Sequence, residues 1–528
     1  MKSIFKFNIS KSFLSVAMLS TMLVSCSEDV MDGINKDVNH TTNVPSKYIL
    51  SDVITSTAFN NVGGDLSTYF STYVEHEVGN DNQLYRAEHR QNEPSASSTF
   101  NNTWGNLYSS LKNARIIIAK CSEGGEQEGN SKTKGMAEVL AALNSALLTD
   151  AFGDIPYSQA ALPSLANGLP QYMNPVIDKQ EDVYKSIIKY LDDAIADLPQ
   201  GDNHLSGSVG NFDLLYKGDA AKWTKLAYGL KARYTMHLLK RSTDVAGDLR
   251  KVIEYVDKSF SSASEQAAFA VYDANNLNPL FDFEWSRDGI SASKSMSEKL
   301  VDRNDPRARR VYFDSYTWSH YVPGGKGFYV APNGESEQVK NEYNYSVFVY
   351  AQTAPTLLLS YHELLFLKAE ALCRLNRTLE AEPILKEAVV AAIANSENSV
   401  AAAMNAPTVL DNGGLEDISD GAISKTEAEA YFDNSVKPLF AANALKEVMN
   451  QKYIAFWGAS GEATECYNDI RRMKALGENF VTLKNPNKFP LRCPYGADDT
   501  TANPNVQKAY GDGQYVYSES VWWAGGTR

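Results

Sequence analysis

Apolar residues recur every three or four positions along eight segments of the chain, and this spacing predicts a helix in each. In 181–198 the apolar residues form one stripe, and the aspartates of its second half lie outside that stripe. Runs typical of strands are short and few, such as Phe328–Val330 and Val347–Tyr350. The sequence therefore predicts a mostly α fold, with helices over 104–120, 134–150, 181–198, 219–240, 248–258, 357–376, 379–394 and 437–457.

One pair of predicted helices has the spacing of a tetratricopeptide repeat. Ala369, Ala381, Leu385 and Ala388 are separated by 12, 4 and 3 residues, and such a repeat has small, small, large and small residues at these offsets. Small residues there let two antiparallel helices pack closely, with Leu375–Arg377 as the turn between them. Other helix pairs lack a clean 34-residue period, so we expect repeats with long irregular insertions.

Long segments rich in Gly, Pro, Asn and aromatic residues separate the predicted helices. Within them, Pro323–Gly327 is typical of an exposed turn. Long loops in a compact domain often carry function, so we expect ligand contacts from these insertions, with rigid helices behind them. The insertions are 151–180, 199–218, 260–356, 395–436 and 476–521.

The first residues have the pattern of a bacterial lipoprotein signal. Three lysines precede an apolar run over 13–24, which is too short for a permanent membrane helix. The run ends in Leu-Val-Ser before Cys26, where large apolar and small residues before a cysteine indicate lipid attachment to its thiol. An ordinary signal peptide with an incidental cysteine is the alternative. We therefore predict a signal peptide over 1–25, a lipidated flexible tether over 26–46 and one helical-repeat domain over 47–528.

Charge and cysteine content exclude several classes of protein. Removing the signal, which has three lysines and no acidic residue, changes the net charge from −14 to −17, and no basic face for nucleic acid is visible. No later segment is long and apolar enough to cross a membrane. Of the remaining cysteines, Cys121, Cys373, Cys466 and Cys493, none forms a C-x-x-C pair, which argues against zinc. Cys466 and Cys493 are candidates for a disulfide.

Sequence motifs for catalysis are scarce. His76-Glu77 and His362-Glu363 begin like a zinc-protease motif, but neither has the second histidine four positions after the first. The chain has no G-x-S-x-G elbow and no complete phosphate loop. A pair of acids for glycoside hydrolysis cannot be recognised among 64 Asp and Glu residues, since nothing marks one. We therefore predict a protein that is not an enzyme and that has no cofactor or metal site.

Several short motifs, taken in order, resemble the SusD/RagB family of nutrient-binding outer-membrane lipoproteins from Bacteroidetes. Two of them also have a structural explanation: Gly153 and Pro156 can end a helix, and Asp305 with Pro306 can begin one. The resemblance covers nearly the whole mature chain and is closest to the SusD-like branch. It is carried, with the lipid-attachment motif, by Asp150–Tyr157, Gln180–Tyr184, Gly218–Trp223, Asn304–Arg307 and Trp522-Trp523.

The resemblance implies a fold, a place and a role. Family members have tetratricopeptide-like units in an α/α superhelix and cover a SusC-like TonB-dependent transporter at the outer membrane. They capture oligosaccharides, or peptides in some branches, for import, and they are not enzymes. The acidic residues after Cys26 resemble the export signal of surface lipoproteins, so the lipid anchor is expected on the outer face of the outer membrane.

Candidate ligand contacts are aromatic residues, which offer flat faces to pyranose rings, and amide groups for hydroxyls. The resemblance places an arc of aromatics near Trp104, although Trp104 and Tyr108 share a helical stripe with Leu111 and can equally be core residues. Aromatics on the 260–356 insertion are harder to explain as core, and Tyr73, Tyr85 and Arg86 are weaker candidates. The predicted ligand-binding residues are Trp104, Asn106, Tyr108, Trp285, Trp318 and Tyr321.

Two hypotheses of function remain open at this stage. The first is a surface protein that captures a glycan and passes it to a transporter, in which case loop aromatics carry the binding. The second is a peptide- or protein-binding module that uses its helical repeats as a concave scaffold, in which case the repeat face carries it. A glycosidase is a third and weaker alternative.

Overall fold

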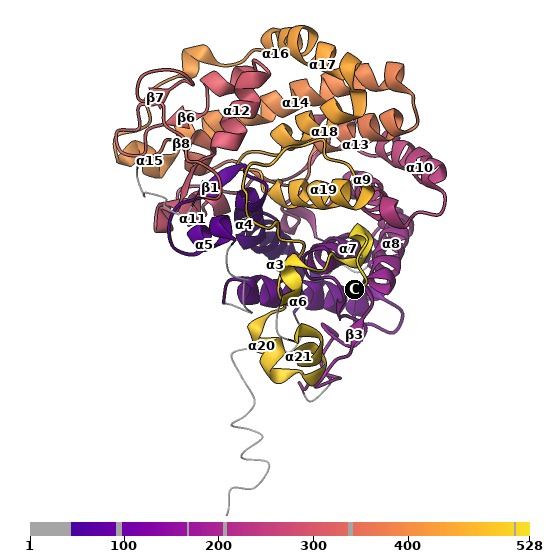
Figure 1. Ribbon diagram of the computed structural model, residues 1–528. Coiled ribbons are helices and arrows are strands. Elements are labelled where there is room, and N and C mark those ends of the chain that lie inside the picture. Colours follow the sequence, from indigo (N-terminus) through magenta and orange to yellow (C-terminus); the bar gives the residue numbers. More distant parts are fainter. Residues whose placement is uncertain (1–43, 91–97, 166–167, 204–208, 336–341, 512–513) are drawn as a thin grey trace, which may run out of the picture. The chain divides into compact units, whose positions relative to one another are not determined.

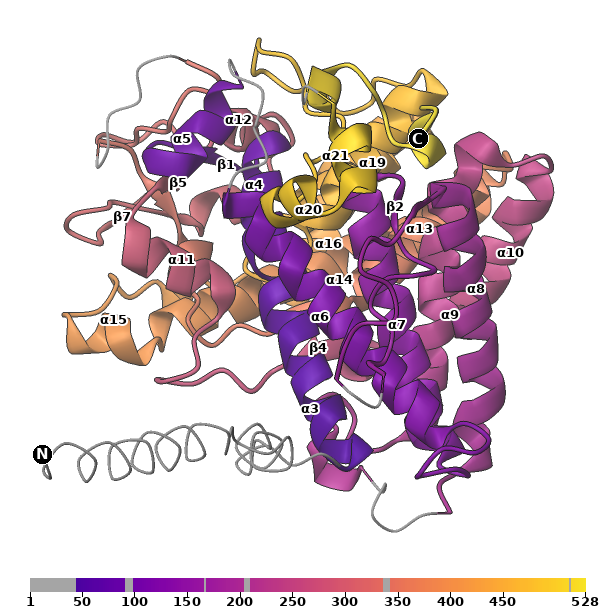
Figure 2. The same cartoon turned by 90° about the horizontal axis from the view of Figure 1, so that it is seen from below.

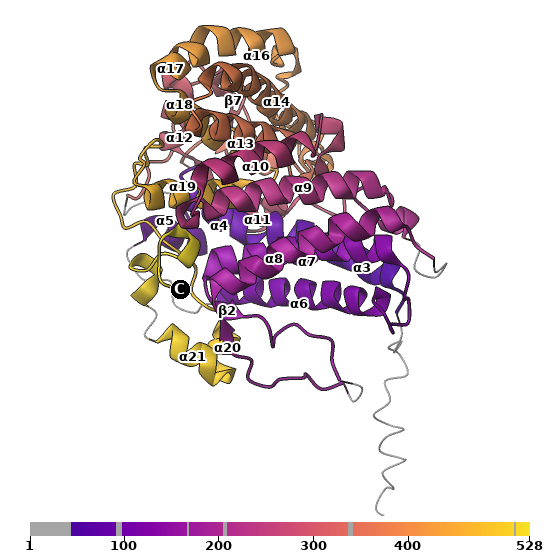
Figure 3. The same cartoon turned by 90° about the vertical axis from the view of Figure 1, so that its right-hand side faces the viewer.

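The helices form an array in which successive helices are neighbours. In the computed structural model, α6 packs on α7, α7 on α8, α8 on α9 and α9 on α10, as Figure 3 shows most clearly. The array continues from α10 to α13 and α14, although about 100 residues separate α10 from α13. The array helices are α6 (Ser98–Cys121), α7 (Ser131–Phe152), α8 (Gln180–Asp197), α9 (Ala220–His237), α10 (Val245–Asp257), α13 (Tyr361–Arg374) and α14 (Thr378–Met404).

The structure describes residues 44–90, 98–165, 168–203, 209–335, 342–511 and 514–528. The predicted signal peptide, Cys26 and the tether up to residue 43 lie outside these ranges. Residues Ser46–Arg528 form one compact unit. Within the described residues, no helix has the length and apolar character needed to cross a membrane.

The predicted repeat pair packs as its spacing indicates. Ala369 lies on α13, and Ala381, Leu385 and Ala388 lie on α14; all four are fully buried in one apolar cluster between the two helices. Asn376 in the turn has a positive φ of 59°, which asparagine tolerates better than most residues. The mostly α, tetratricopeptide-like fold is thus confirmed.

The chain between α10 and α13 folds into short helices and strands beside the array. Its helices are α11 (Pro279–Arg287) and α12 (Lys294–Asp302), seen on the left of Figure 1 and Figure 2. Within the described residues these strands, together with β1 to β3 from earlier in the chain, form small antiparallel sheets. The strand orders are β1-β5, β2-β3, β4-β9 and β7-β6-β8. Their strands are Glu77–Gly79, Ile155–Pro156, Ile177–Asp178, Ala267–Phe269, Ile290–Ala292, Tyr312–Phe313, His320–Tyr321, Tyr345–Ser346 and Thr356–Leu359, numbered β1 to β9.

The remaining helices precede or follow the array helices along the chain. Three precede it, with a π-helix over Thr57–Val62 between the first two. Among the described residues, seven follow α14, with a π-helix over Phe432–Val436 between α16 and α17. The set comprises α3 (Ser46–Ser56), α4 (Asp65–Tyr73), α5 (Asn82–His89), α15 (Pro407–Asp411), α16 (Lys425–Tyr431), α17 (Lys437–Ala442), α18 (Ala444–Ala455), α19 (Ala463–Leu476), α20 (Ala497–Ala502) and α21 (Pro504–Tyr510).

Several predicted elements differ from the structure. Val347–Tyr350 is a buried 3-10 helix and Phe328–Val330 is no strand, because a short apolar run cannot by itself distinguish strand from helix. The helix predicted over 357–376 begins only at Tyr361, since Thr356–Leu359 pairs with β4. Helix α14 runs ten residues beyond its predicted end, and the helix predicted over 437–457 is divided at Asn443.

The candidate disulfide between Cys466 and Cys493 is not formed, and the two capping motifs are confirmed in part. Cys466 and Cys493 are both buried free thiols. Asp305 accepts a hydrogen bond from the backbone N–H of Arg307, with Pro306 at the first position, although the helix it begins is a 3-10 turn. Gly153 follows α7 with a φ of +82°.

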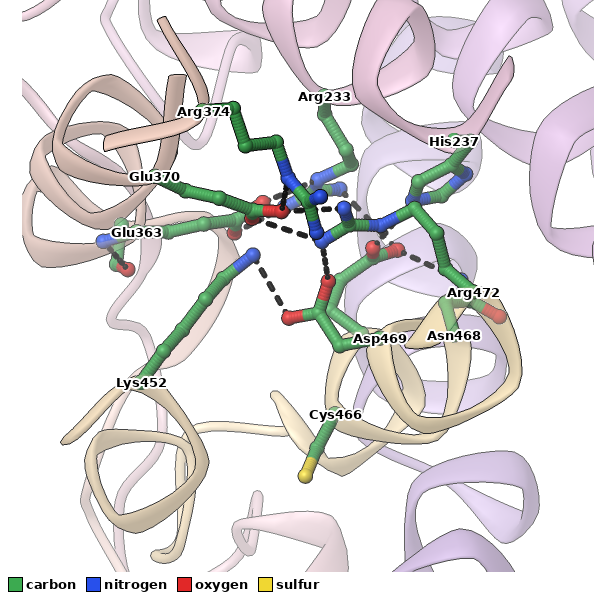
Figure 4. A network of polar contacts seen from close by, with 12 residues as sticks. Arg233, His237, Glu363, Glu370, Arg374, Lys452, Cys466, Asn468, Asp469 and Arg472 are labelled. Atoms are coloured by element: carbon green, nitrogen blue, oxygen red, sulfur yellow. Dashed lines mark hydrogen bonds and ion pairs between the residues drawn. The ribbon is translucent and has the colours of Figure 1, made fainter. Parts of the chain in front are cut away.

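A buried network of ion pairs joins α19 to three other helices (Figure 4). Arg472 donates to both oxygens of Glu370 on α13, at 2.5 and 2.8 Å. Arg233 on α9 does the same to Glu363, at 2.6 Å for each bond. Lys452 on α18 lies 2.7 Å from Asp469 on α19. Each buried charge has a partner of opposite sign, which a buried charge requires.

His237 completes this network between two carboxylates. Its Nε2 lies 2.8 Å from Glu465 and its Nδ1 3.2 Å from Asp150, and Tyr184 also contacts Nδ1. Burial lowers the pKa of His237, but Glu465 and then Asp150 outweigh burial and raise the pKa to about 9. The protonated imidazolium is therefore the form that the fold stabilises.

We predict that His237 makes stability depend on pH in the alkaline range. Because the folded pKa is above the unfolded value of 6.5, the contribution is complete below pH 6.5 and is lost as pH rises through about 9. It amounts to about 3 kcal/mol. The measurement is urea unfolding of the wild type and His237→Gln from pH 6 to 10. The gap between the two free energies of unfolding should be largest at pH 6, shrink between pH 6.5 and about 9 and change little above that; a gap independent of pH would contradict the charged form.

Candidate functional site

Two tryptophans from separate segments form an exposed pair, which we call the aromatic platform. Trp285 on α11 and Trp318 after β6 have ring centroids 6.3 Å apart and ring planes tilted by 41°. The side chain of Trp285 is 42% exposed, and that of Trp318 is half-buried. Sequence reasoning named both residues, and the structure brings them together.

A ring contact within helix α11 and a cap at its N-terminus fix the position of Trp285. The indole stacks on Phe281, one helical turn earlier, with centroids 5.4 Å apart and planes 11° from parallel. Asn278 caps the helix by accepting from the backbone N–H groups of Leu280 and Phe281. Its amide also donates to the carbonyls of Ala354 and Ala459, so the helix start is tied to two distant segments.

A tight turn holds Trp318 against the other ring. The Asp314 carboxylate accepts from the backbone N–H groups of Tyr316 and Thr317, at 2.9 and 2.7 Å. This turn gives Trp318 a φ of +54°, a strained conformation for a bulky residue. The ring of Trp318 meets that of Tyr350 edge to face at 6.0 Å. A strained and partly exposed tryptophan favours a role in contact rather than in packing.

Helix α11, which carries Trp285, also borders a cleft of about 260 Å³, which we call the polar cleft. Helix α11 contributes Asp282, which is three residues from Trp285 and therefore a neighbour of it on the helix surface. Predicted residue Asn106 of α6 also lines the cleft. Its full lining is Phe59, Asn60, Gly64, Asp65, Thr68, Asn102, Asn106, Pro279, Asp282, Phe283 and Arg287.

The polar cleft combines charge, amides and an aromatic face. Burial raises the pKa of Asp65, and the nearby Arg287 guanidinium offsets part of that rise. Arg287 also lies over the ring of Phe283, 4.8 Å from its centroid. Amide and carboxylate groups around an aromatic surface can hydrogen-bond the hydroxyls of a sugar whose ring stacks nearby.

Of the predicted ligand residues on α6, Trp104 lies in the core and Tyr108 is half-buried beside it. Trp104 is 3% exposed, contacts Phe152 and Tyr495, and donates from Nε1 to Asp499 at 2.5 Å. Tyr108 donates its hydroxyl to the carbonyl of Pro156 at 2.7 Å. Core packing, the alternative explanation, accounts for these contacts, because α6 places the face that carries Trp104, Tyr108 and Leu111 against the neighbouring segments.

The remaining predicted residues are placed as follows. Tyr321 is half-buried on β7, and among the described residues no ring contact joins it to either tryptophan of the platform. Tyr73 is buried, Tyr85 stacks on His89 at 5.6 Å, and Arg86 is exposed on α5. Sequence reasoning missed Asp282 and also Tyr316, whose side chain is 86% exposed two residues before Trp318.

The two His-Glu pairs are buried structural groups. Burial lowers the pKa of His76 to about 3, and its Nε2 lies 2.9 Å from the carbonyl of Tyr453. Burial raises the pKa of Glu77 to about 8, against hydrogen bonds from Ser346 and Trp457. His362 pairs with Glu462 at 2.9 Å. Over the described ranges, no group of three or more His, Cys, Asp or Glu could hold a metal ion.

Comparisons with known proteins agree on one family. A SusD-like family model, described as starch-binding and associating with the outer membrane, matches residues 38–495. The solved structure of a SusD/RagB family protein from Bacteroides thetaiotaomicron is 56% identical, with a TM-score of 0.86, and the match covers 92% of this chain and 100% of that one. No curated protein matches the chain.

More distant solved structures share the fold. A SusD homologue from Bacteroides fragilis is 17% identical with a TM-score of 0.62, over 91% of this chain and 100% of the other. A chitin-binding SusD homologue from Flavobacterium johnsoniae is 16% identical with a TM-score of 0.64, over 90% and 98%. At these identities the likeness is one of fold.

Proposed function

This chain belongs to the SusD-like family, and from that membership we propose that it captures an oligosaccharide at the cell surface for import. The family description supplies the nutrient-binding role and the association with the outer membrane. The lipid anchor on Cys26 and the delivery of ligand to a TonB-dependent transporter are part of the proposal.

The observation that carries the proposal is the aromatic platform, which shares helix α11 with the polar cleft. Trp285 and Trp318 offer two ring faces to the apolar sides of consecutive sugar units. Asp282 and Asn106 in the adjoining cleft offer hydrogen-bond partners to hydroxyl groups. One helix, α11, supplies both Trp285 and Asp282, so stacking and hydrogen bonding are held in one rigid relation.

We propose binding without chemical change of the ligand. The polar cleft contains two carboxylates, Asp65 and Asp282, so a pair of acids is available in principle. Burial raises the pKa of Asp65 and Arg287 offsets only part of that rise, so the proposal of binding alone rests on the family, whose description is one of binding.

The transporter part of the proposal rests on family membership. A neighbouring gene for a TonB-dependent transporter, and copurification of the two proteins from the outer membrane, would support the delivery step.

A second candidate function, peptide binding on the repeats, also has an observation in its favour. A groove of about 500 Å³ lies between α14 and α16, with Val390, Ile393 and Ile423 among its lining residues. If peptides bind in place of glycans, and Val390→Asp abolishes that binding, this second function replaces the first.

We predict that Trp318→Ala and Trp285→Ala each weaken glycan binding about tenfold, because each removes one stacking face. Starch- and chitin-derived oligosaccharides are the first probes, since the family description names starch and a relative of the same fold is described as chitin-binding. The measurement is isothermal titration calorimetry.

The matched control is Tyr172→Ala, which removes an aromatic ring of similar exposure (47%) from the loop between β2 and β3, away from the platform. Its affinity should equal that of the wild type. Equal affinity of all three variants and the wild type would rule out the platform as the site of glycan binding.

We predict that Asp282→Asn weakens binding of the same glycan a fewfold, by about 1 kcal/mol, because it removes an ionised hydrogen-bond acceptor. Chromatography of the oligosaccharide after long incubation should show no cleavage by the wild type or the variant. Cleavage by the wild type that disappears in Asp282→Asn or Asp65→Asn would instead establish a glycosidase.

A further inference from the structure

A second cleft, which we call the basic cleft, lies between the end of α19, the segment that follows it, and Arg90 after α5. Its volume is about 260 Å³. In Figure 1 the segment after α19 runs back past α4 and α5, and hydrogen bonds from Asn485 to Glu88 fix this approach. The lining residues used below are Arg90, Lys474, Asn479, Phe480, Thr482 and Phe489.

Arg90 is a buried cation whose hydrogen bonds are incomplete. Its side chain is 4% exposed, and Nη2 donates to the carbonyl of Tyr73 at 2.6 Å. Its Nε has no hydrogen-bond partner in the described part of the chain. The guanidinium lies 5.7 Å from the centroid of Phe489. An unpaired donor on a buried cation is costly, and an acceptor in the cleft would remove that cost.

Lys474 brings a second positive charge to the same cleft. It lies in the last turn of α19, with Nζ 5.0 Å from the centroid of Phe489. Burial, and then the charge of Arg90, lower the pKa of Lys474. Among the described residues no carboxylate forms an ion pair with Lys474. The two cations therefore repel each other, and an anion between them would relieve that repulsion.

The acidic groups nearby are engaged elsewhere. Glu478, which also lines the cleft, pairs with Arg374 on α13, at 2.7 and 2.8 Å. Glu75 accepts from the backbone N–H groups of Lys484 and Asn485. Burial raises the pKa of Glu88 to about 8, against the opposing effect of Arg90. The ends of α19 and α5 direct carbonyl dipoles toward the cations, but these groups carry no net charge.

We propose that the basic cleft binds a carboxylate-bearing sugar unit, a uronic acid, with Arg90 and Lys474 on the carboxylate. A carboxylate matches the guanidinium fork and the ammonium charge. Asn479 and Thr482 are polar groups for the ring hydroxyls, and Phe480 and Phe489 are faces for the ring. The cleft is smaller than the usual site of a drug-sized ligand and suits a single sugar unit.

This site is separate from the one proposed for the oligosaccharide. The basic cleft and the polar cleft share no lining residue. The inference therefore goes beyond the proposed function: the protein recognises an acidic unit in addition to the stacked rings. Trp318→Ala should leave uronate binding unchanged, so the failure of one site is distinguishable from the failure of the other.

The test measures binding of galacturonate to the full chain in detergent, by ligand-observed nuclear magnetic resonance. The methyl ester of galacturonate is the matched ligand, with the same ring and no charge. We expect a dissociation constant near 1 mM for the acid, and at least tenfold weaker binding of the ester.

Variants then locate the site. Lys474→Gln, on an exposed side chain, should weaken binding about fivefold, as loss of one partly solvated charge implies. Lys488→Gln is the matched control: this lysine is exposed in the segment after α19 but does not line the cleft, so the variant should bind like the wild type. Arg90→Gln should abolish binding, and circular dichroism melting shows whether that variant folds; if it does not, Lys474→Gln decides.

Any of the following results would overturn the proposal. They are equal binding of the acid and its ester, no weakening in Lys474→Gln, and tighter binding of a peptide carboxylate such as acetylglycine than of galacturonate. The absence of any binding by the acid would overturn it as well.

Discussion

Charged residues buried on one face of α19 form the constraint on which the rest of the structure depends. Glu465, Asp469 and Arg472 follow one another at helical spacing and pair with residues of α9, α13 and α18. Buried ion pairs lose most of their Coulomb gain to desolvation, so they add little net stability, but a displaced helix would leave several charges unpaired. The network therefore mainly fixes the register of α19, because only one position of this helix against the array pairs all of these charges.

The fixed position of α19 extends to the aromatic platform through the short connection from α18. Ala459 in that connection accepts a hydrogen bond from Asn278, the residue that caps α11. A Cβ on Gly461 would meet the backbone of Gly63 at 3.1 Å, so this close approach requires glycine. Because α11 carries both Trp285 and Asp282, the ionic network fixes the position of these two proposed binding groups through the segments between α19 and α11.

Local periodicity predicted the array well, because helices such as α8 and α10 bury an apolar stripe at helical spacing and expose polar residues on the other face. It missed α19, whose buried face contains the charges of the network in place of apolar residues. It missed α4 because Ser67, Thr68 and Ser71 are buried on it together with its aromatics. Trp285 and Trp318 could be named from their place in a long insertion, but their pairing depends on long-range packing that spacing does not encode. Trp104 is buried for the same reason: segments near residues 152 and 495 cover it.

The backbone conformation at Trp318 is not the one expected of a ring that is exposed by chance. A bulky residue with positive φ costs on the order of 1 kcal/mol or more, so a neutral sequence would favour glycine or asparagine there. The strain is held by the Asp314 carboxylate below and by the backbone N–H of Glu416, which donates to the carbonyl of Trp318 at 3.1 Å. These contacts rigidify the turn before any ligand arrives, which lowers the entropy lost on binding. A ring held in a strained conformation, against a second ring on a capped helix, is the geometry on which the proposed contact with a glycan rests.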